Sequence, residues 1–229
     1  MTLVTTGAAA QEKIEGTIAA DFVNQYIWRG QDLGHVAVQP TLGVAWKGLS
    51  LTAWGSVGLT DSEDTKELDL TLAYAWRGFN IGVTDYWFDK GGADPACDGK
   101  YFTYAAHKTA HVWEVNVGYD FGPVALQWYT NFAGNDGVGK SGKRAYSSYM
   151  EVSAPFRLAG LDWKAAVGAV PYATTSYSDA GGFAVTNVSL RATKDITVTK
   201  SFTLPVFAGV TANPSNEKAY LLFGFTLQP

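Results

Sequence analysis

The segment Leu68-Asp-Leu-Thr-Leu-Ala-Tyr-Ala-Trp76 decides the fold, because large apolar residues alternate with small or polar ones along its whole length. One phase carries three leucines, a tyrosine and a tryptophan, and the other carries an aspartate, a threonine and two alanines. Successive side chains of a β-strand point to opposite faces. The segment is therefore predicted to form a strand with one apolar face and one polar face.

The same alternation recurs along the rest of the chain, and no stretch has helical periodicity. No run reaches the ~18 apolar residues that a transmembrane helix requires. The pattern predicts an all-β fold of about twelve strands, at residues 14–29, 37–47, 49–60, 68–77, 79–88, 111–121, 123–133, 146–157, 161–171, 183–193, 199–211 and 218–227.

Short and long connections alternate between these strands. The short ones are Lys47-Gly48, Arg77-Gly78, 121–123 and 158–160, and the long ones are 30–36, 61–67, 89–110, 134–145, 172–182 and 212–217. Residues 194–198 are expected to form an intermediate turn where a tight one is due. Bacterial membrane barrels have short periplasmic turns and long extracellular loops. We predict a closed antiparallel up-and-down transmembrane β-barrel in a bacterial outer membrane, with both termini in the periplasm.

Composition agrees with a lipid-facing sheet protein. Charged residues make up only 17% of the 229 residues, whereas aromatic residues reach 14% and there are 25 glycines. The net charge of −4 and the absence of basic clusters argue against a nucleic-acid partner. Residues 12–229 are predicted to form a single domain. Residues 1–11, with Ala8-Ala9-Ala10, resemble the end of a secretory signal peptide.

Aromatic residues are predicted to form two belts that anchor the barrel in outer-membrane lipid. The alternative is the core of a soluble barrel, but this many large rings would overfill a small core. Trp46, Trp76, Tyr119, Phe121, Phe156 and Trp163 lie beside the short turns, and Tyr26, Trp28, Trp87, Trp113, Trp128 and Phe132 lie near the other strand ends.

The polar phase of the strands is predicted to line an enclosed lumen. Two interpretations stay open: a polar pore that passes small polar solutes, or an interior filled by paired charges. Arg29, Arg77, Arg157, Asp21, Asp69 and Glu114 are expected to set the electric field of such a pore. The other predicted lumen residues are Gln25, Gln39, Asn116, Asp120, Gln127, Asn131, Glu151, Lys164 and Arg191.

No cofactor, metal site or catalytic centre is predicted. The three histidines, His35, His107 and His111, fall in expected loops, and the i, i+4 pair 107/111 has no predicted helix to present it. The acidic loop 61–64 lacks the EF-hand spacing. A barrel hydrolase would need a strand-borne histidine beside a serine, and none is expected. The chain is therefore predicted not to be an enzyme.

Three stretches of the first strands resemble a known family. Asp21-Phe-Val-Asn-Gln-Tyr-Ile-Trp-Arg-Gly30, Val38-Gln-Pro40 and Leu51-Thr-Ala-Trp-Gly-Ser56 are similar to the opening of the TorF-type porins of Gram-negative bacteria. The resemblance implies an outer-membrane barrel with a role in transport. The alternative is a non-conducting barrel that binds a protein partner through loops 89–110 and 134–145 as part of a membrane complex.

Overall fold

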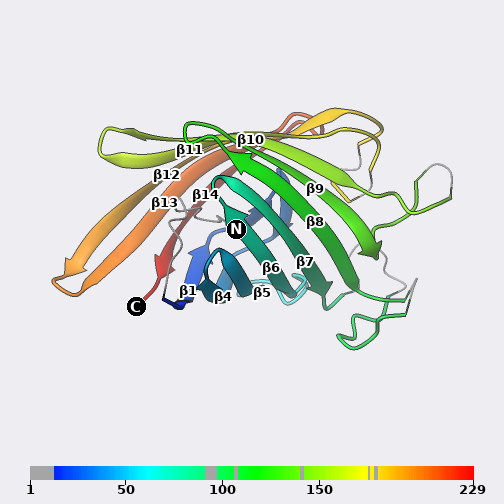
Figure 1. Ribbon diagram of the computed structural model, residues 1–229, viewed down its shortest axis with the longest axis horizontal. Helices are drawn as coiled ribbons and strands as arrows, with labels where there is room; N and C mark the ends of the chain where they lie inside the picture. Colours follow the sequence, from blue (N-terminus) through cyan, green and yellow to red (C-terminus); the bar gives the residue numbers. More distant parts are fainter. Residues whose placement is uncertain (1–12, 91–96, 106–107, 140–141, 175, 178–179) are drawn as a thin grey trace.

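The computed structural model describes residues 13–90, 97–105, 108–139, 142–174, 176–177 and 180–229. Twelve long strands form one closed barrel in which neighbours in sequence pair antiparallel, and β1 pairs with both β14 and β4 to close it (Figure 1). The predicted closed up-and-down barrel is confirmed. The barrel strands are β1 (Glu15–Val23), β4 (Ala37–Trp46), β5 (Leu49–Gly58), β6 (Glu67–Trp76), β7 (Phe79–Phe88), β8 (His111–Asp120), β9 (Ala125–Gly134), β10 (Ser148–Leu158), β11 (Leu161–Val170), β12 (Ala184–Thr199), β13 (Phe202–Asn213) and β14 (Lys218–Leu227).

Tight turns occupy one end of the barrel. Lys47-Gly48, Arg77-Gly78 and Ala159-Gly160 each have positive φ at both positions. Two successive positive φ values are typical of type I′ hairpin turns, whose twist matches that of the flanking strands. The first residue of β1 and the last residue of β14 lie at this same end of the barrel. Glu15 pairs with Ala45, next to the first of these turns, and the chain reverses direction from each barrel strand to the next.

The prediction of a turn at residues 194–198 is wrong. β12 continues through these residues, with Ile196 paired to Leu204, and the chain reverses only at residues 200–201. The physical reason is that Ile196 and Val198 continue the apolar phase of the strand. Both are exposed on the outside of a hairpin that extends beyond its neighbours (Figure 1). The regular alternation of tight turns and long loops is thereby complete.

The prediction of one strand over residues 14–29 is also wrong, because these residues form two separate strands, β1 and β2. β1 ends at Val23, and a separate two-stranded sheet follows, with β2 (Tyr26–Trp28) and β3 (Gln31–Gly34). Asn24 interrupts the ladder: its side-chain amide donates to the carbonyl of Leu221, and its side-chain oxygen accepts from the amide of Phe223. The backbone amide of residue 24 still donates to the carbonyl of Phe223, but the ladder with β14 ends at this point and the chain turns away from the wall.

Burial in this barrel is inverted relative to a water-soluble protein. The large apolar side chains face outward: Leu72 and Trp76 are 53% and 54% exposed. The enclosed face is polar, and Asp69 and Glu114 are only 4% and 2% exposed. Soluble proteins place most aliphatic side chains inside. No helix in the described ranges has the length and hydropathy to span a bilayer.

Candidate functional site: the lumen and its inward hairpin

The β2–β3 hairpin lies inside the barrel. It contacts the inner faces of strands from β5 round to β13: Tyr26 packs on Trp54 of β5, Trp28 on Tyr86 of β7, and the tip contacts β8, β9, β10, β12 and β13. A segment outside the wall could not touch all of these strands. The hairpin therefore narrows the lumen in the half of the barrel that carries the long loops.

Arg29 is held at the tip of the hairpin. Its guanidinium donates two hydrogen bonds to the carboxylate of Glu114, at 2.5 and 2.9 Å, and both side chains are buried. The guanidinium carbon also lies 3.9 Å from the ring centroid of Tyr129 and 4.8 Å from that of Tyr149. Bidentate pairing and stacking on rings are the interactions for which arginine is suited.

Glu114 is saturated with donors. Besides Arg29, the hydroxyls of Tyr86 and Tyr177 donate to its two oxygens, at 2.8 and 2.5 Å. Burial, together with the charge of Glu114, raises the pKa of Tyr177 well above its ordinary value, so this hydroxyl stays protonated and remains a donor. A buried carboxylate is stable only when paired and hydrogen-bonded. The Arg29–Glu114 pair meets this condition, and it fixes the hairpin to the wall.

A second acidic pair of the lumen has no arginine or lysine partner in the part of the chain that the structure describes. Glu67 and Asp69 are two residues apart on the inner face of β6, and both are buried. One oxygen of Asp69 has no hydrogen-bond partner. Among the residues that the structure describes, no lysine or arginine forms an ion pair with either carboxylate. Two adjacent buried carboxylates without a counter-charge hold a proton between them or draw in a cation, so this part of the lumen accepts positive charge.

The structure places most of the predicted lumen residues on the inner face. Gln39, Asp69, Glu114, Asn116 and Asn131 are buried there. Partly exposed positions on the same face are occupied by Asp21, whose carboxylate accepts from Thr226, by Gln127, by Glu151 beside Lys164, and by Arg191, which lies over the ring of Phe207.

Four predicted lumen residues lie elsewhere. Gln25 follows β1 and donates to Asp32 of the hairpin. Arg77 lies in the tight turn after β6, stacked on Trp76, because the turn directs it along the rim. Asp120 accepts from the amide of Gly122 in the next turn. Arg157 is exposed and pairs with Asp162 at the same end of the barrel.

The aromatic residues expected at the membrane interfaces divide into three groups. Trp46, Trp76, Tyr119 and Trp128 are exposed on the outer surface, and Trp163 stacks on Phe156 there. Trp87 and Trp113 are partly covered: Trp87 donates to the carbonyl of Gly99, and Trp113 stacks on His111. The prediction is wrong for Tyr26 and Trp28, since both lie in the lumen: Tyr26 packs on Trp54, and Trp28 packs against Tyr86 and Tyr177. The chain leaves the wall at Asn24, so the alternation of side chains after this residue no longer indicates which of them face the outer surface.

The prediction that no histidine lies on a strand is also wrong. His111 is the first residue of β8 and is fully buried. Its ring nitrogens contact the carboxylate of Asp85, at 2.8 Å, and the carbonyl of Tyr101, at 2.6 Å. One ring nitrogen thus fastens the segment 97–105 to the barrel, and the other joins β8 to β7. The companion residue of the predicted pair, His107, lies outside the described residues.

Several residues of the site were not predicted, although the sequence pattern indicates their position. Glu67 shares the phase of Asp69, and Tyr86, Tyr129 and Tyr149 lie on the polar phase of their strands, which predicts inward rings. Arg29-Gly30 also matches the dipeptides of the tight turns. Tyr177 comes from the connection between β11 and β12, and no periodicity could have placed it in the lumen.

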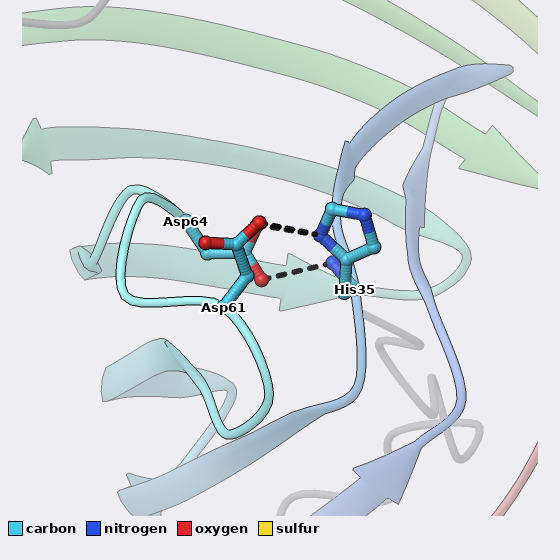
Figure 2. Close-up of side chains that lie close together, drawn as sticks. All are labelled: His35, Asp61 and Asp64. Carbon is cyan, nitrogen blue, oxygen red and sulfur yellow. Dashed lines mark hydrogen bonds and ion pairs between the residues drawn. The ribbon is translucent and has the colours of Figure 1, made fainter.

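A further cluster of polar groups lies where the hairpin rejoins the wall (Figure 2). His35 directly follows β3, and Asp61 and Asp64 belong to the connection between β5 and β6. The hydrogen bond with Asp64 and the negative charge of that carboxylate raise the pKa of His35. Partial burial opposes ionisation of Asp64, but hydrogen bonds from the ring and the backbone of His35 outweigh it and lower the pKa of that carboxyl.

Among known proteins, only solved structures are similar to this chain. No protein-family model and no curated protein matches the chain. A porin refined at 1.8 Å resolution is similar with a TM-score of 0.38 and 12% identity, over 84% of this chain and 62% of that one. OmpF of Salmonella typhi, in a complex with daunomycin, is similar with a TM-score of 0.37 and 11% identity, over 95% and 97% of the two chains. The chain spans less than two thirds of the first porin, and the TorF-type resemblance stays a prediction.

Proposed function

We propose that the chain is an outer-membrane barrel that passes small polar solutes through a lumen narrowed by the β2–β3 hairpin, with both termini in the periplasm. The supporting observation is the inverted burial: apolar and aromatic side chains cover the outside of the closed wall, and charged and amide side chains line the inside. Such a surface is stable in hydrocarbon, where every backbone group must be paired within the protein.

The chemistry of the lumen gives the proposed channel a preference for cations. Arg29 is the cation nearest the constriction, and its charge is neutralised by Glu114. Glu67 and Asp69 have no cationic partner among the described residues, so they hold a proton between them or take up a passing cation, and they do not attract anions. Charges of one sign in a narrow low-dielectric passage raise the local concentration of the opposite ion.

The second candidate is a non-conducting barrel that serves as a binding or scaffold component of a membrane complex. The observation in its favour is the same hairpin. A buried, bidentate arginine with rings on several sides holds the hairpin firmly in the lumen, and the space that these side chains fill is lost to passage. In that case the long loops would contact a protein partner.

Planar-bilayer recordings of the purified protein separate the two candidates. We expect single-channel steps in potassium chloride for the natural sequence, and a reversal potential in a salt gradient that indicates cation preference. Asp69→Asn should reduce that preference, whereas Asp162→Asn, which changes an exposed carboxylate at the opposite end, should not. No conductance at any voltage, in the natural sequence and in Arg29→Ala alike, would remove the channel and favour the scaffold.

A further inference from the structure

Three side chains with metal-ligating atoms converge at the loop end of the barrel, away from the lumen acids. One ligand atom from each of His35, Asp61 and Asp64 lies within 4.8 Å of the other two (Figure 2). We propose that these residues form a binding site for a divalent transition-metal ion, with Zn²⁺ as the reference ligand.

The spacing suits a metal ion of this class. Nδ1 of His35 lies 2.9 Å from Oδ1 of Asp64 and 3.8 Å from Oδ2 of Asp61. Zinc binds nitrogen and oxygen at about 2.0–2.2 Å, so tetrahedral ligands lie about 3.3 Å from one another. The two separations from Nδ1 of His35 bracket that value, and all three ligand atoms lie within 4.8 Å of one another, so side-chain rotation can bring them to one ion. His35 and Asp61 are partly open to solvent, which leaves a position for water.

The carboxylates are held in place before any ion binds. Asp64 fits between two glycines: a Cβ on Gly58 would come within 2.6 Å of its Oδ2, and a Cβ on Gly34 within 3.3 Å of its Cγ. The backbone amide of His35 also donates to Asp64. Asp61 uses one oxygen to accept from the amide of Glu63, and its other oxygen faces the ring of His35.

The charge and the donor type define the ligand. Two carboxylates and a neutral imidazole carry two negative charges, which match a divalent cation. Within the described part of the chain, no lysine or arginine forms an ion pair with Asp61 or Asp64, and Lys90 pairs with Glu63 instead. Calcium and magnesium prefer oxygen ligands alone. An imidazole among the ligands favours zinc, copper, nickel or iron.

A bound ion would join two separate parts of the fold. His35 is the residue after β3 and therefore fixes the base of the inward hairpin, whereas Asp61 and Asp64 belong to the β5–β6 connection. Coordination would add a link between the hairpin and the wall at a point remote in sequence from Arg29. The proposal concerns binding and does not depend on whether the barrel conducts.

Isothermal titration calorimetry of chelator-treated protein in detergent with Zn²⁺ tests the site. We expect one ion per chain, and His35→Ala and Asp61→Asn should each weaken binding about tenfold or more, since even outer-shell changes cost 10–100-fold. Two matched controls should bind as the natural sequence does. Glu63→Gln removes a neighbouring charge of the same loop whose carboxylate pairs with Lys90, and His107→Ala removes another histidine. Ca²⁺ should bind more weakly than Zn²⁺.

Three results would overturn the assignment. The first is an absence of stoichiometric Zn²⁺ binding to the natural sequence. The other two are equal loss in Glu63→Gln and Asp61→Asn, and unchanged binding in His35→Ala, and either of these would indicate general attraction to an acidic loop. Because Asp64 also holds the backbone of His35, Asp64→Asn is not used alone. Anomalous scattering at the zinc edge from crystals of the complex would place the ion between the three side chains if the proposal is right.

Discussion

Two Arg-Gly turns in this chain have the same backbone and opposite surroundings. Arg29-Gly30 has φ values of 50° and 80°, and Arg77-Gly78 has 47° and 86°. Arg77 lies at the exposed rim with its guanidinium 5.0 Å from the ring of Trp76. Arg29 lies in the lumen, paired with Glu114. The comparison teaches that the dipeptide determines the reversal of the chain, whereas the groups that surround the turn decide what the arginine does.

The largest difference should appear when each arginine is removed. Arg29→Ala leaves Glu114 buried without its cation, and breaking a buried pair costs about 3–5 kcal/mol. We expect the hairpin to leave its position, with faster amide exchange in residues 26–34 and, if the barrel conducts, larger single-channel steps. Arg77→Ala removes one exposed contact with a ring, worth about 0.5–1 kcal/mol.

Hydrogen exchange followed by mass spectrometry measures both variants. The double variant Arg29→Met/Glu114→Gln provides the control, because it removes both charges and should restore part of the protection. Equal exchange in the hairpin of Arg29→Ala and of the natural sequence would show that the ion pair does not hold the hairpin.

A smaller but still clear effect is expected from the turn glycines. A Cβ on Gly30 would lie 1.8 Å from the carbonyl oxygen of Thr186, whereas a Cβ on Gly160 would meet nothing within 4 Å. Both have positive φ, so alanine costs about 1–2 kcal/mol of backbone strain at either site. Gly30→Ala should therefore displace the hairpin in the exchange experiment, and Gly160→Ala should only lower the free energy of unfolding. Similar exchange profiles for the two variants would contradict the packing of the tip.

The smallest effect is expected from two tryptophans that the sequence pattern places alike, in the outer aromatic belts. Trp76 is exposed on the outer wall, and Trp28 packs inside against Tyr86 and Tyr177. In vesicles of brominated lipid, Trp76→Phe should remove emission that the lipid quenches, and Trp28→Phe should remove emission that it does not quench. The reverse assignment would place the hairpin outside the barrel.

Much of the fold followed from the sequence because the physics is local. Period-2 alternation in segments such as 68–76 indicates a strand with two unlike faces, and Lys47-Gly48 or Arg77-Gly78 is enough to specify a tight turn. Closure then follows, since hydrocarbon tolerates no unpaired strand edge. The error at 194–198 was local too: an intermediate turn was predicted there, although Ile196 and Val198 continue the strand.

The candidate site could be predicted only in part. Asp69 and Glu114 were assigned to the lumen from their phase, but the phase says nothing about depth or about partners. Arg29 was assigned to the lumen as part of a strand, whereas it enters as the tip of a hairpin. Nothing local distinguishes these cases, because the displacement begins with Asn24, which bonds to residues about 200 positions away in the chain.

By itself, the sequence determined which side chains of the wall share a face, where most of the tight turns lie, and hence that the wall is a barrel with a polar inside. Those properties depend on neighbours within a few residues. Only the tertiary structure decided that β2 and β3 leave the wall, that Arg29 meets Glu114 and a ring of tyrosines, and that His35 faces Asp61 and Asp64. Each of these contacts joins residues from separate strands or loops, and closure of the barrel alone brings them together.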